Sequence, residues 1–327
     1  MIMPTQLVPL GNSGLKVPLM GMGTWAWGQK MLWGYGIEYG DKELEEAYQV
    51  SLKEGINFFD TAEVYGWGNS ESLLGKFMKA APSHQRPLIA SKFAPMLPWR
   101  LTGNSLQKAL KKSLTRLGME KLDLYYLHNP KSLRPIKTWV NAIGDAYEEG
   151  LIKSVGVSNY DLNQTREAAD ILAKRNIPLA CNQIHYSLLH QSPETSGLIG
   201  KCREMGIAIV SYMPLAHGLL TGKYTPENPP KGARGKSYPP HQLARLRPLI
   251  ELMQEIGSSH GDKTPAQIAV NWNISKGTIT LVGAKNGKQA LQNIGALGWS
   301  LTPEEILQLD KTASGLQDII KAWWAKV

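Results

Sequence analysis

The chain has 327 residues, of which 43% are hydrophobic and 19% are charged, a composition that allows a large buried core and argues against wholesale disorder. No uninterrupted apolar stretch reaches the roughly 18 to 20 residues of a membrane span, and the first residues, MIMPTQLVPLG, lack the basic start and apolar centre of a signal peptide. The net charge of +9 favours anionic cofactors or substrates, but no helix-turn-helix, zinc or RNA-binding motif supports nucleic acid as a partner.

Short strand-like runs alternate with helix-like segments along most of the chain. The leucines between 106 and 117 have helical spacing, for example, and that stripe ends at Gly118. Alternating β and α units predict parallel strands, and eight of them favour closure into one α/β domain, a (β/α)8 TIM barrel over residues 1–327. The predicted strands are 19–22, 57–60, 88–93, 122–128, 154–157, 180–184, 208–212 and 278–282.

Three segments depart from this alternation. Residues 1–18 contain two apolar runs around the turn sequence GNSG, which predicts an N-terminal β-hairpin that plugs the lower end of the barrel. Residues 213–263 follow the seventh strand and are rich in proline and glycine, so we expect a long loop that covers the cofactor. Residues 302–327 begin with the helix-start signal TPEE and predict a C-terminal helix and tail.

Four chemically active side chains fall at the ends of three successive predicted strands. Asp60 and Tyr65 lie in FFDTAEVYG, Lys92 lies in SKF, and His128 lies in YYLHNP. A free tyrosine has a pKa of about 10, so donating its proton to a carbonyl oxygen near neutral pH requires a group that stabilises the phenolate. A lysine at roughly 4 Å and an effective dielectric of about 20 contributes about 4 kcal/mol as an upper bound. We expect Lys92 to have this role.

The neighbours of this lysine complete a proton-transfer site. A buried lysine without a partner loses its proton, and Asp60 would keep Lys92 charged. His128 would orient the carbonyl group and share the proton. Each residue also has a plainer interpretation: Asp60 and Lys92 as a structural ion pair, His128 as a core histidine, and Tyr65 as a packed loop residue. The occurrence of all four together favours catalysis.

These residues and several further motifs resemble the aldo-keto reductases. The motifs follow that family's order from GMGTW at 21–25, through GVSNY at 156–160 and NQIHY at 182–186, to GAKNGKQALQN at 283–293. The resemblance covers nearly the whole chain. It implies a (β/α)8 barrel that reduces carbonyl compounds with NADPH, with the four residues above as its catalytic set.

The dinucleotide fingerprint GxGxxG is missing, because Gly21 and Gly23 are followed by Ala26 where the third glycine would stand. A barrel offers another phosphate site, in the loops after its last two strands and at a helix N-terminus. Residues 283–286 lie at that place. By resemblance, Lys285 would be nearest the 2′-phosphate, which favours NADPH over NADH. Taken alone, Lys285 also fits a solvated surface charge.

The resemblance assigns the rest of the NADP(H) site as well. Ser158, Asn159 and Gln183 would hold the carboxamide of the nicotinamide, and Tyr212 would stack on its ring. The other residues that the resemblance assigns to the cofactor are Thr24, Trp25, Asp60, Pro214, Leu215, Gly222, Lys223, Gly283, Gln289, Gln292 and Asn293.

Three positions depart from the family's usual pattern. Met213 stands where serine is usual, Gln292 where glutamate often meets the adenine, and Asn129 where tryptophan is frequent. The first two concern the grip on the cofactor, and the third concerns the shape of the substrate pocket.

The substrate pocket is expected to be aromatic. Tryptophans are concentrated in the loops after the first three strands, and the C-terminal tail adds Trp323 and Trp324. A pocket of this kind accepts flat apolar or aromatic carbonyl compounds more readily than small polar ones. The residues expected to contact substrate are Trp25, Trp27, Trp33, Trp67, Trp99 and His128.

The sequence therefore predicts an NADPH-dependent carbonyl reductase with no metal. Its partner would be a small carbonyl compound, without nucleic acid or membrane, and the chain is expected to be a monomer, with an oligomer as the alternative. A second hypothesis follows from the potassium-channel β subunits, which resemble the same family and act as nucleotide-binding regulatory partners. Cys181 and Cys202 are too few for a disulfide framework, which favours the cytoplasm, or an organelle stroma if a transit peptide has been removed.

Overall fold

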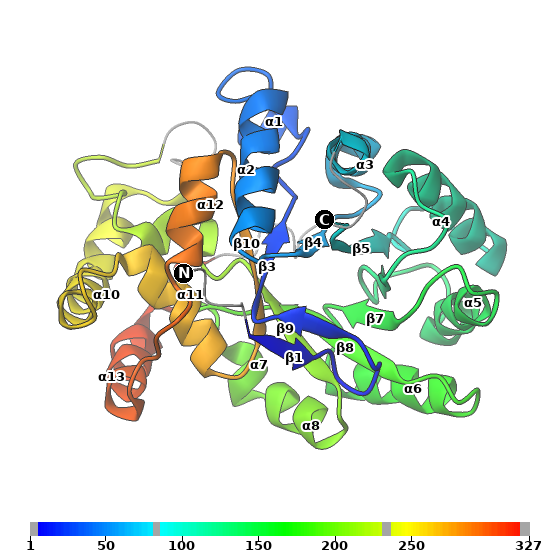
Figure 1. Cartoon of the computed structure of the whole chain (residues 1–327). Helices are drawn as coiled ribbons and strands as arrows, with labels where there is room; N and C mark the ends of the chain where they lie inside the picture. The colour runs from blue at the N-terminus through cyan, green and yellow to red at the C-terminus, as the bar shows by residue number, and fades with distance from the viewer. Residues whose placement is uncertain (1–5, 81–85, 231–236, 321–327) are drawn as a thin grey trace.

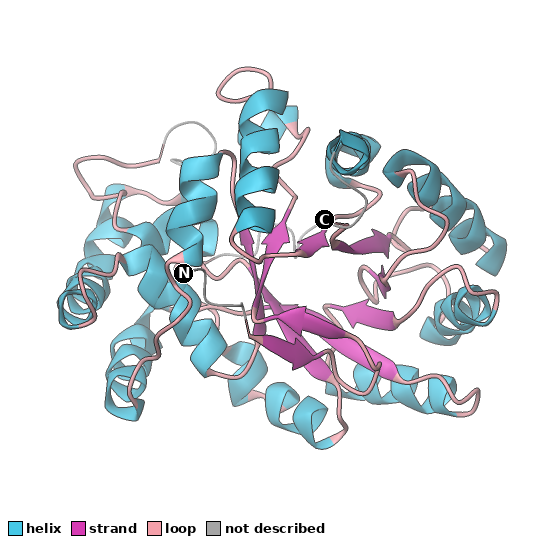
Figure 2. Cartoon of the chain, viewed as in Figure 1, coloured by secondary structure: helices cyan, strands magenta, loops and turns pink. Residues whose placement is uncertain are grey.

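A closed barrel of eight parallel strands, surrounded by helices, forms the molecule (Figures 1 and 2). This computed structural model describes residues 6–80, 86–230 and 237–320. The order around the barrel is β10-β3-β4-β5-β6-β7-β8-β9, which confirms the predicted (β/α)8 fold. The strands are β3 (Met20–Gly23), β4 (Phe58–Asp60), β5 (Leu88–Phe93), β6 (Leu124–Leu127), β7 (Val155–Ser158), β8 (Leu179–His185), β9 (Ala208–Tyr212) and β10 (Ile279–Gly283).

The surrounding helices carry the chain from the end of one strand back to the start of the next, as parallel pairing requires. Helix α4 shows why such a segment packs on the barrel: its leucines at 106, 110, 114 and 117 are all buried, and Gly118 ends it with φ 65°. In the described part of the chain, no helix has both the length and the apolar character to cross a membrane. The helices are α1 (Lys30–Trp33), α2 (Asp41–Lys53), α3 (Asn69–Ala80), α4 (Gly103–Leu117), α5 (Ile136–Glu148), α6 (Leu162–Ala173), α7 (Ser192–Thr195), α8 (Leu198–Glu204), α10 (Pro240–Ser259), α11 (Pro265–Ser275), α12 (Gly287–Ile294) and α13 (Pro303–Ala313).

The N-terminal hairpin closes one end of the barrel. Strands β1 (Leu7–Pro9) and β2 (Lys16–Pro18) pair antiparallel, as predicted. Leu10, between them, belongs to the buried cluster inside the barrel that contains Ala180, near the start of β8. Gly11 has φ +54°, and a Cβ there would lie 2.2 Å from the carbonyl oxygen of Ala180. The hairpin therefore plugs the amino end of the strands and leaves their carboxyl end open.

The prediction of a long loop over 213–263 is wrong in its second half. That stretch contains the 20-residue helix α10, preceded by the short 3-10 helix η3 (Ala216–Thr221). Residues 231–236 lie outside the described residues. The proline-rich sequence before α10 obscured an apolar stripe whose i, i+3 and i+4 spacing is helical. Its buried members include Leu243, Leu246, Leu249, Met253 and Ile256.

The predicted C-terminal helix is confirmed as α13. Thr302 accepts a hydrogen bond from the backbone N–H of Glu305 at 3.2 Å, and the Glu305 carboxylate accepts one from Thr302 N at 2.8 Å, so both halves of the capping box are formed. A further 3-10 helix, η4 (Ser314–Leu316), follows. Residues 321–327, which include Trp323 and Trp324, lie outside the described residues.

Candidate active site

The four predicted catalytic residues meet at the open end of three neighbouring strands. Asp60 is the last residue of β4, Lys92 is the last but one of β5, and His128 directly follows β6. Tyr65 begins η1 (Tyr65–Gly68), the short 3-10 helix after β4. Since β4, β5 and β6 are adjacent and parallel, their carboxyl ends lie side by side. The barrel thus brings together residues that are up to 68 positions apart.

Lys92 is the centre of this cluster. Its side chain is completely buried, and its Nζ forms an ion pair with Oδ1 of Asp60. The same nitrogen donates hydrogen bonds to the carbonyl oxygen of Thr61 at 2.8 Å and to the phenol oxygen of Tyr65 at 3.3 Å. An ammonium has three donors, and all three are used here. The lysine is therefore held in one position and aimed at the phenol.

Asp60 is fixed from two sides. Its Oδ1 pairs with Lys92, and its Oδ2 accepts a hydrogen bond from Nε2 of Gln183 at 2.8 Å. Burial raises the pKa of Asp60 and lowers the pKa of Lys92, while the attraction between the two charges opposes both shifts. Asp60 and Lys92 can be both a buried ion pair and part of a proton-transfer site, because Lys92 also contacts Tyr65.

The net shift in the pKa of Tyr65 is upward, although a neighbouring lysine by itself favours the phenolate. Burial raises the pKa of Tyr65 well above its ordinary value, and the charge of Asp60 raises it further. The cost of placing a phenolate in a buried site outweighs the attraction of Lys92 for it. Tyr65 consequently keeps its proton at neutral pH, which is the form that a proton donor needs.

His128 lies edge-on to Tyr65, with the ring centroids 5.7 Å apart. Burial, and to a smaller extent the charge of Lys92, lower the pKa of His128 to about 3. Its Nδ1 is buried and has no hydrogen-bond partner among the described residues. His128 is therefore a neutral imidazole near pH 7, so it can form hydrogen bonds but does not bring a positive charge.

A cleft of about 1340 Å³ opens above the catalytic cluster. Small-molecule pockets usually measure about 300 to 1,000 Å³, so this one has room for a dinucleotide together with a substrate. Lys92 lies beneath its surface, and Gly222 is also absent from the lining. The predicted site residues that do line it are Thr24, Trp25, Trp33, Asp60, Tyr65, His128, Ser158, Asn159, Gln183, Tyr212, Pro214, Leu215, Lys223, Gly283, Lys285, Gln289, Gln292 and Asn293.

The residues predicted to hold the nicotinamide are connected to one another by hydrogen bonds. Asn159 follows β7 with a positive φ of 62°. Its Nδ2 donates to the backbone oxygen of His128 and to Oγ of Ser158, both at 3.1 Å, and its Oδ1 accepts from the hydroxyl of Tyr212 at 2.8 Å. Ser158 in turn donates to the backbone oxygen of Gln183 at 2.9 Å. This end of the cleft is preorganised.

The loop after β9 has an unusual backbone. Met213, Ala216 and His217 all have positive φ values, between 49° and 59°. Such conformations cost of order 1 to 3 kcal/mol each and need support from their surroundings. Part of that support comes from Tyr238, just before α10, whose hydroxyl is 2.5 Å from Nδ1 of His217. Met213, which stands where the family usually has serine, therefore lies in a loop of unusual backbone conformation beside the cleft.

The opposite end of the cleft is formed by the start of α12. Asn286 caps this helix by accepting a hydrogen bond from the backbone N–H of Gln289 at 2.9 Å. The side-chain oxygen of Gln289 accepts from the backbone N–H of Lys285 at 2.9 Å. Asn293 donates to the backbone oxygen of Gly283 at 3.2 Å. Lys285 is not a freely solvated surface charge, since only 19% of its side chain is exposed.

Two of the predicted tryptophans form the wall next to Tyr65. Trp25 and Trp33 line the cleft and meet edge to face, with centroids 5.5 Å apart. Trp25 is also 6.3 Å from the ring of Tyr65. The sequence did not single out the apolar residues facing them, although they come from the loops after β5 and β6 and the position of those loops could have indicated them. They are Met96, Leu97 and Leu133.

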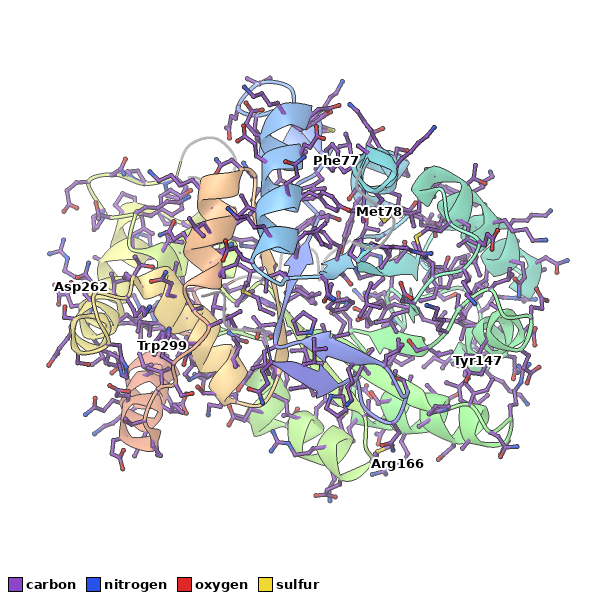
Figure 3. The ribbon with its side chains drawn as sticks, in the orientation of Figure 1. Phe77, Met78, Tyr147, Arg166, Asp262 and Trp299 are labelled. Carbon is purple, nitrogen blue, oxygen red and sulfur yellow. The ribbon has the colours of Figure 1, made fainter. Side chains whose placement is uncertain are left out.

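The other three tryptophans do not line the cleft. Trp27 is completely buried, donates a hydrogen bond to the carbonyl oxygen of Ala284 at 3.0 Å, and packs against Phe77, which Figure 3 labels on α3. The expectation that it contacts substrate is corrected, because it has no accessible surface. Trp67 and Trp99 are 79% and 61% exposed and do not line the cleft. Their position in loops after the strands was therefore not enough to predict contact with substrate.

Known proteins share both the sequence and the fold. The model of the aldo/keto reductase family matches residues 19–314. The chain is 40% identical over 321 residues to the chloroplastic pyridoxal reductase of Arabidopsis thaliana, which covers 95% of this chain and 86% of that protein. It is 30% identical over 328 residues to L-glyceraldehyde 3-phosphate reductase of Escherichia coli O157:H7, with 92% and 90% covered.

A solved structure has the same architecture. The aldo-keto reductase of Klebsiella pneumoniae in complex with NADPH superimposes with a TM-score of 0.70 at 25% identity, and the match covers 95% of each chain. The agreement extends over almost the whole barrel.

Proposed function

Because the chain belongs to the aldo/keto reductase family, we propose that it reduces an aldehyde to an alcohol with NADPH and that Tyr65 protonates the carbonyl oxygen. The observation that carries this proposal is the position of Lys92, which is buried and donates a hydrogen bond to the phenol oxygen of Tyr65 at 3.3 Å. An ordinary structural ion pair would need no phenol within reach. Here the pair ends on a protonated tyrosine at the surface of a cleft.

NADPH supplies the hydride that reduces the carbonyl carbon. The residues of the chain manage the oxygen: Tyr65 gives its proton to that atom as negative charge develops there, and Lys92 stabilises the phenolate that remains. Asp60 keeps the ammonium in place through the transfer. His128, as a neutral imidazole, forms a hydrogen bond to the carbonyl oxygen and orients it towards Tyr65.

The cleft fits this cofactor at both ends. One end has the hydrogen-bonded set of Asn159 and Tyr212, with an amide for a carboxamide and a ring for stacking. The other end has Lys285 and the first turn of α12, where backbone N–H groups and a cation suit phosphate. The Klebsiella pneumoniae relative solved with NADPH supports the same choice.

Aromatic aldehydes are the proposed substrates, with pyridoxal as the first to test. Trp25 and Trp33 give the cleft a flat apolar wall, and the ring of Trp25 lies beside that of Tyr65. The relative from Arabidopsis thaliana is named for its reduction of pyridoxal, which has an aromatic ring with an aldehyde. Both observations favour a planar ring over a flexible aliphatic chain.

The test is NADPH oxidation, followed by absorbance, with pyridoxal, benzaldehyde, aliphatic aldehydes and sugar aldehydes as substrates. The proposal expects the highest kcat/KM among the aromatic aldehydes and a preference for NADPH over NADH. Preference for sugars or short aliphatic aldehydes would reject the substrate class while leaving the reaction intact. Tight binding of NADPH without turnover of any aldehyde would reject the reductase and favour a regulatory nucleotide-binding protein.

A further inference from the structure

Lys285 is enclosed by protein groups. Its Nζ donates a hydrogen bond to the carbonyl oxygen of Trp33 at 2.7 Å and lies 3.3 Å from Oε2 of Glu38. The same ammonium is 4.7 Å from the ring centroid of Tyr39. Whereas the side chain of Lys285 is 19% exposed, that of Glu38 is 63% exposed. A largely covered cation is thus paired with a carboxylate that a ligand can reach.

An ordered turn holds Glu38 in this position. The backbone N–H of Glu38 donates to the carbonyl oxygen of Gly34 at 2.8 Å, and that of Gly36 donates to Tyr39 O at 2.8 Å. Gly34 ends α1 with φ 75°, and a Cβ there would lie 2.9 Å from Cδ of Glu38. The positive φ favours glycine at this position and lets the turn form. The turn directs Glu38 towards Lys285, although the two residues are 247 positions apart.

We infer that Glu38 sets the cofactor preference of this chain by competing with the 2′-phosphate of NADPH for Lys285. The inference rests on the proposed function, since it concerns the cofactor proposed there. Glu38 and Lys285 line the same cleft as Gln289, at the phosphate end. A 2′-phosphate that pairs with Lys285 must displace the carboxylate or have it as a neighbour, and either outcome weakens binding because two anions share one cation.

The same carboxylate does not penalise NADH. The 2′-hydroxyl of NADH is uncharged and can donate a hydrogen bond to a carboxylate, as it does in other dinucleotide sites. Lys285 alone would make the protein bind NADPH more tightly than NADH. Glu38 reduces this difference in affinity. An exposed ion pair contributes little to stability, so the effect of Glu38 should be on binding and not on folding.

The decisive experiment is calorimetric titration of the full chain with 2′,5′-ADP, which carries the 2′-phosphate, and with 5′-ADP, which lacks it. Neither probe requires an active enzyme. Glu38→Gln should tighten the binding of 2′,5′-ADP about tenfold at low salt, because Lys285 can then pair with the 2′-phosphate without sharing its charge with a carboxylate. Binding of 5′-ADP should remain within about twofold, since that ligand has no competing anion there.

Two further variants identify the mechanism. Glu120→Gln removes the same charge from an exposed residue after α4, and should leave the affinity for both nucleotides unchanged. In a Lys285→Met background, the gain from Glu38→Gln should be clearly smaller, because only direct repulsion between the carboxylate and the 2′-phosphate is then removed and no cation is left to compete for.

The inference is overturned if Glu38→Gln gives no gain, or if the gain is equally large without Lys285. Binding of both nucleotides by the unmodified protein, with no response to Glu38→Gln, would reject the inference alone. Failure of the unmodified protein to bind either nucleotide would reject the proposed cofactor site together with it. As a second readout, the ratio of kcat/KM for NADPH to that for NADH should rise in Glu38→Gln.

Discussion

The ammonium of Lys92 and the phenol oxygen of Tyr65 lie 3.3 Å apart, within hydrogen-bonding distance, although 27 positions separate the residues. Burial keeps the phenol protonated, since its pKa lies well above the usual value. The ammonium is therefore already beside the oxygen that becomes negative when the proton leaves. In the proposed reaction, this arrangement would stabilise the transition state more than the resting state, which is what raises a catalytic rate.

Removing the phenol oxygen should abolish most of the proton transfer. We expect Tyr65→Phe to lower kcat by about 10² to 10⁴, the usual contribution of a general acid, while the dissociation constant for NADPH stays unchanged. Stopped-flow turnover and fluorescence titration measure the two quantities. Tyr48→Phe is the matched control, because Tyr48 is a buried tyrosine of α2 whose hydroxyl has no partner among the described residues. Wild-type turnover in Tyr65→Phe would exclude Tyr65 as the acid.

Lys92 should matter for stability as well as for rate. Lys92→Met leaves the buried carboxylate of Asp60 without its ionic partner, which costs about 3 to 5 kcal/mol in the free energy of unfolding. Replacing both residues, as Asp60→Leu with Lys92→Met, should recover most of that loss because no buried charge remains. Urea unfolding measures both variants. Equal stability of the single and double variants would mean that the carboxylate is not charged in the folded protein.

The histidine should make the protein less stable in acid. The pKa of His128 falls from 6.5 to about 3 on folding, so the unfolded chain binds more protons than the folded chain between these values. Its contribution to stability is therefore complete above the unfolded pKa and is lost as the pH falls towards 3. His128→Gln should lose less unfolding free energy than the unmodified protein between pH 7.5 and 5.0, measured by urea unfolding. An identical loss in both proteins would contradict the lowered pKa.

Substituting the tryptophans should have different effects, depending on where each ring lies. Trp25→Ala should raise KM for an aromatic aldehyde, since Trp25 lines the cleft and contacts Tyr65. Trp67→Ala, at an exposed ring outside the lining, should leave KM unchanged. Trp27→Ala should instead lower stability by about 3 to 5 kcal/mol, because it removes a buried ring. Steady-state kinetics and thermal unfolding distinguish these outcomes. An increase in KM for Trp67→Ala would show that Trp67 belongs to the substrate pocket after all.

The sequence by itself was sufficient to predict the order of strands and helices and the meeting of the proposed catalytic residues. Strand-helix alternation is a local pattern, and a parallel barrel places every strand's carboxyl end on one face, so Asp60, Lys92 and His128 had to converge. The helix start at Thr302 was equally local, since its capping box lies within four residues.

Other properties were decided only by the tertiary structure. The raised pKa of Tyr65 depends on how much protein surrounds the phenol, and desolvation leaves no mark in the sequence. The burial of Trp27 and the pairing of Glu38 with Lys285 join the loop after β3 to the loop after β10, which are adjacent only because the barrel closes. Helix α10 was missed because the proline-rich sequence before it obscured an apolar stripe, whose burial against the core only the tertiary structure shows. Local patterns thus determined the scaffold, whereas burial and long-range contacts determined the chemistry of its site.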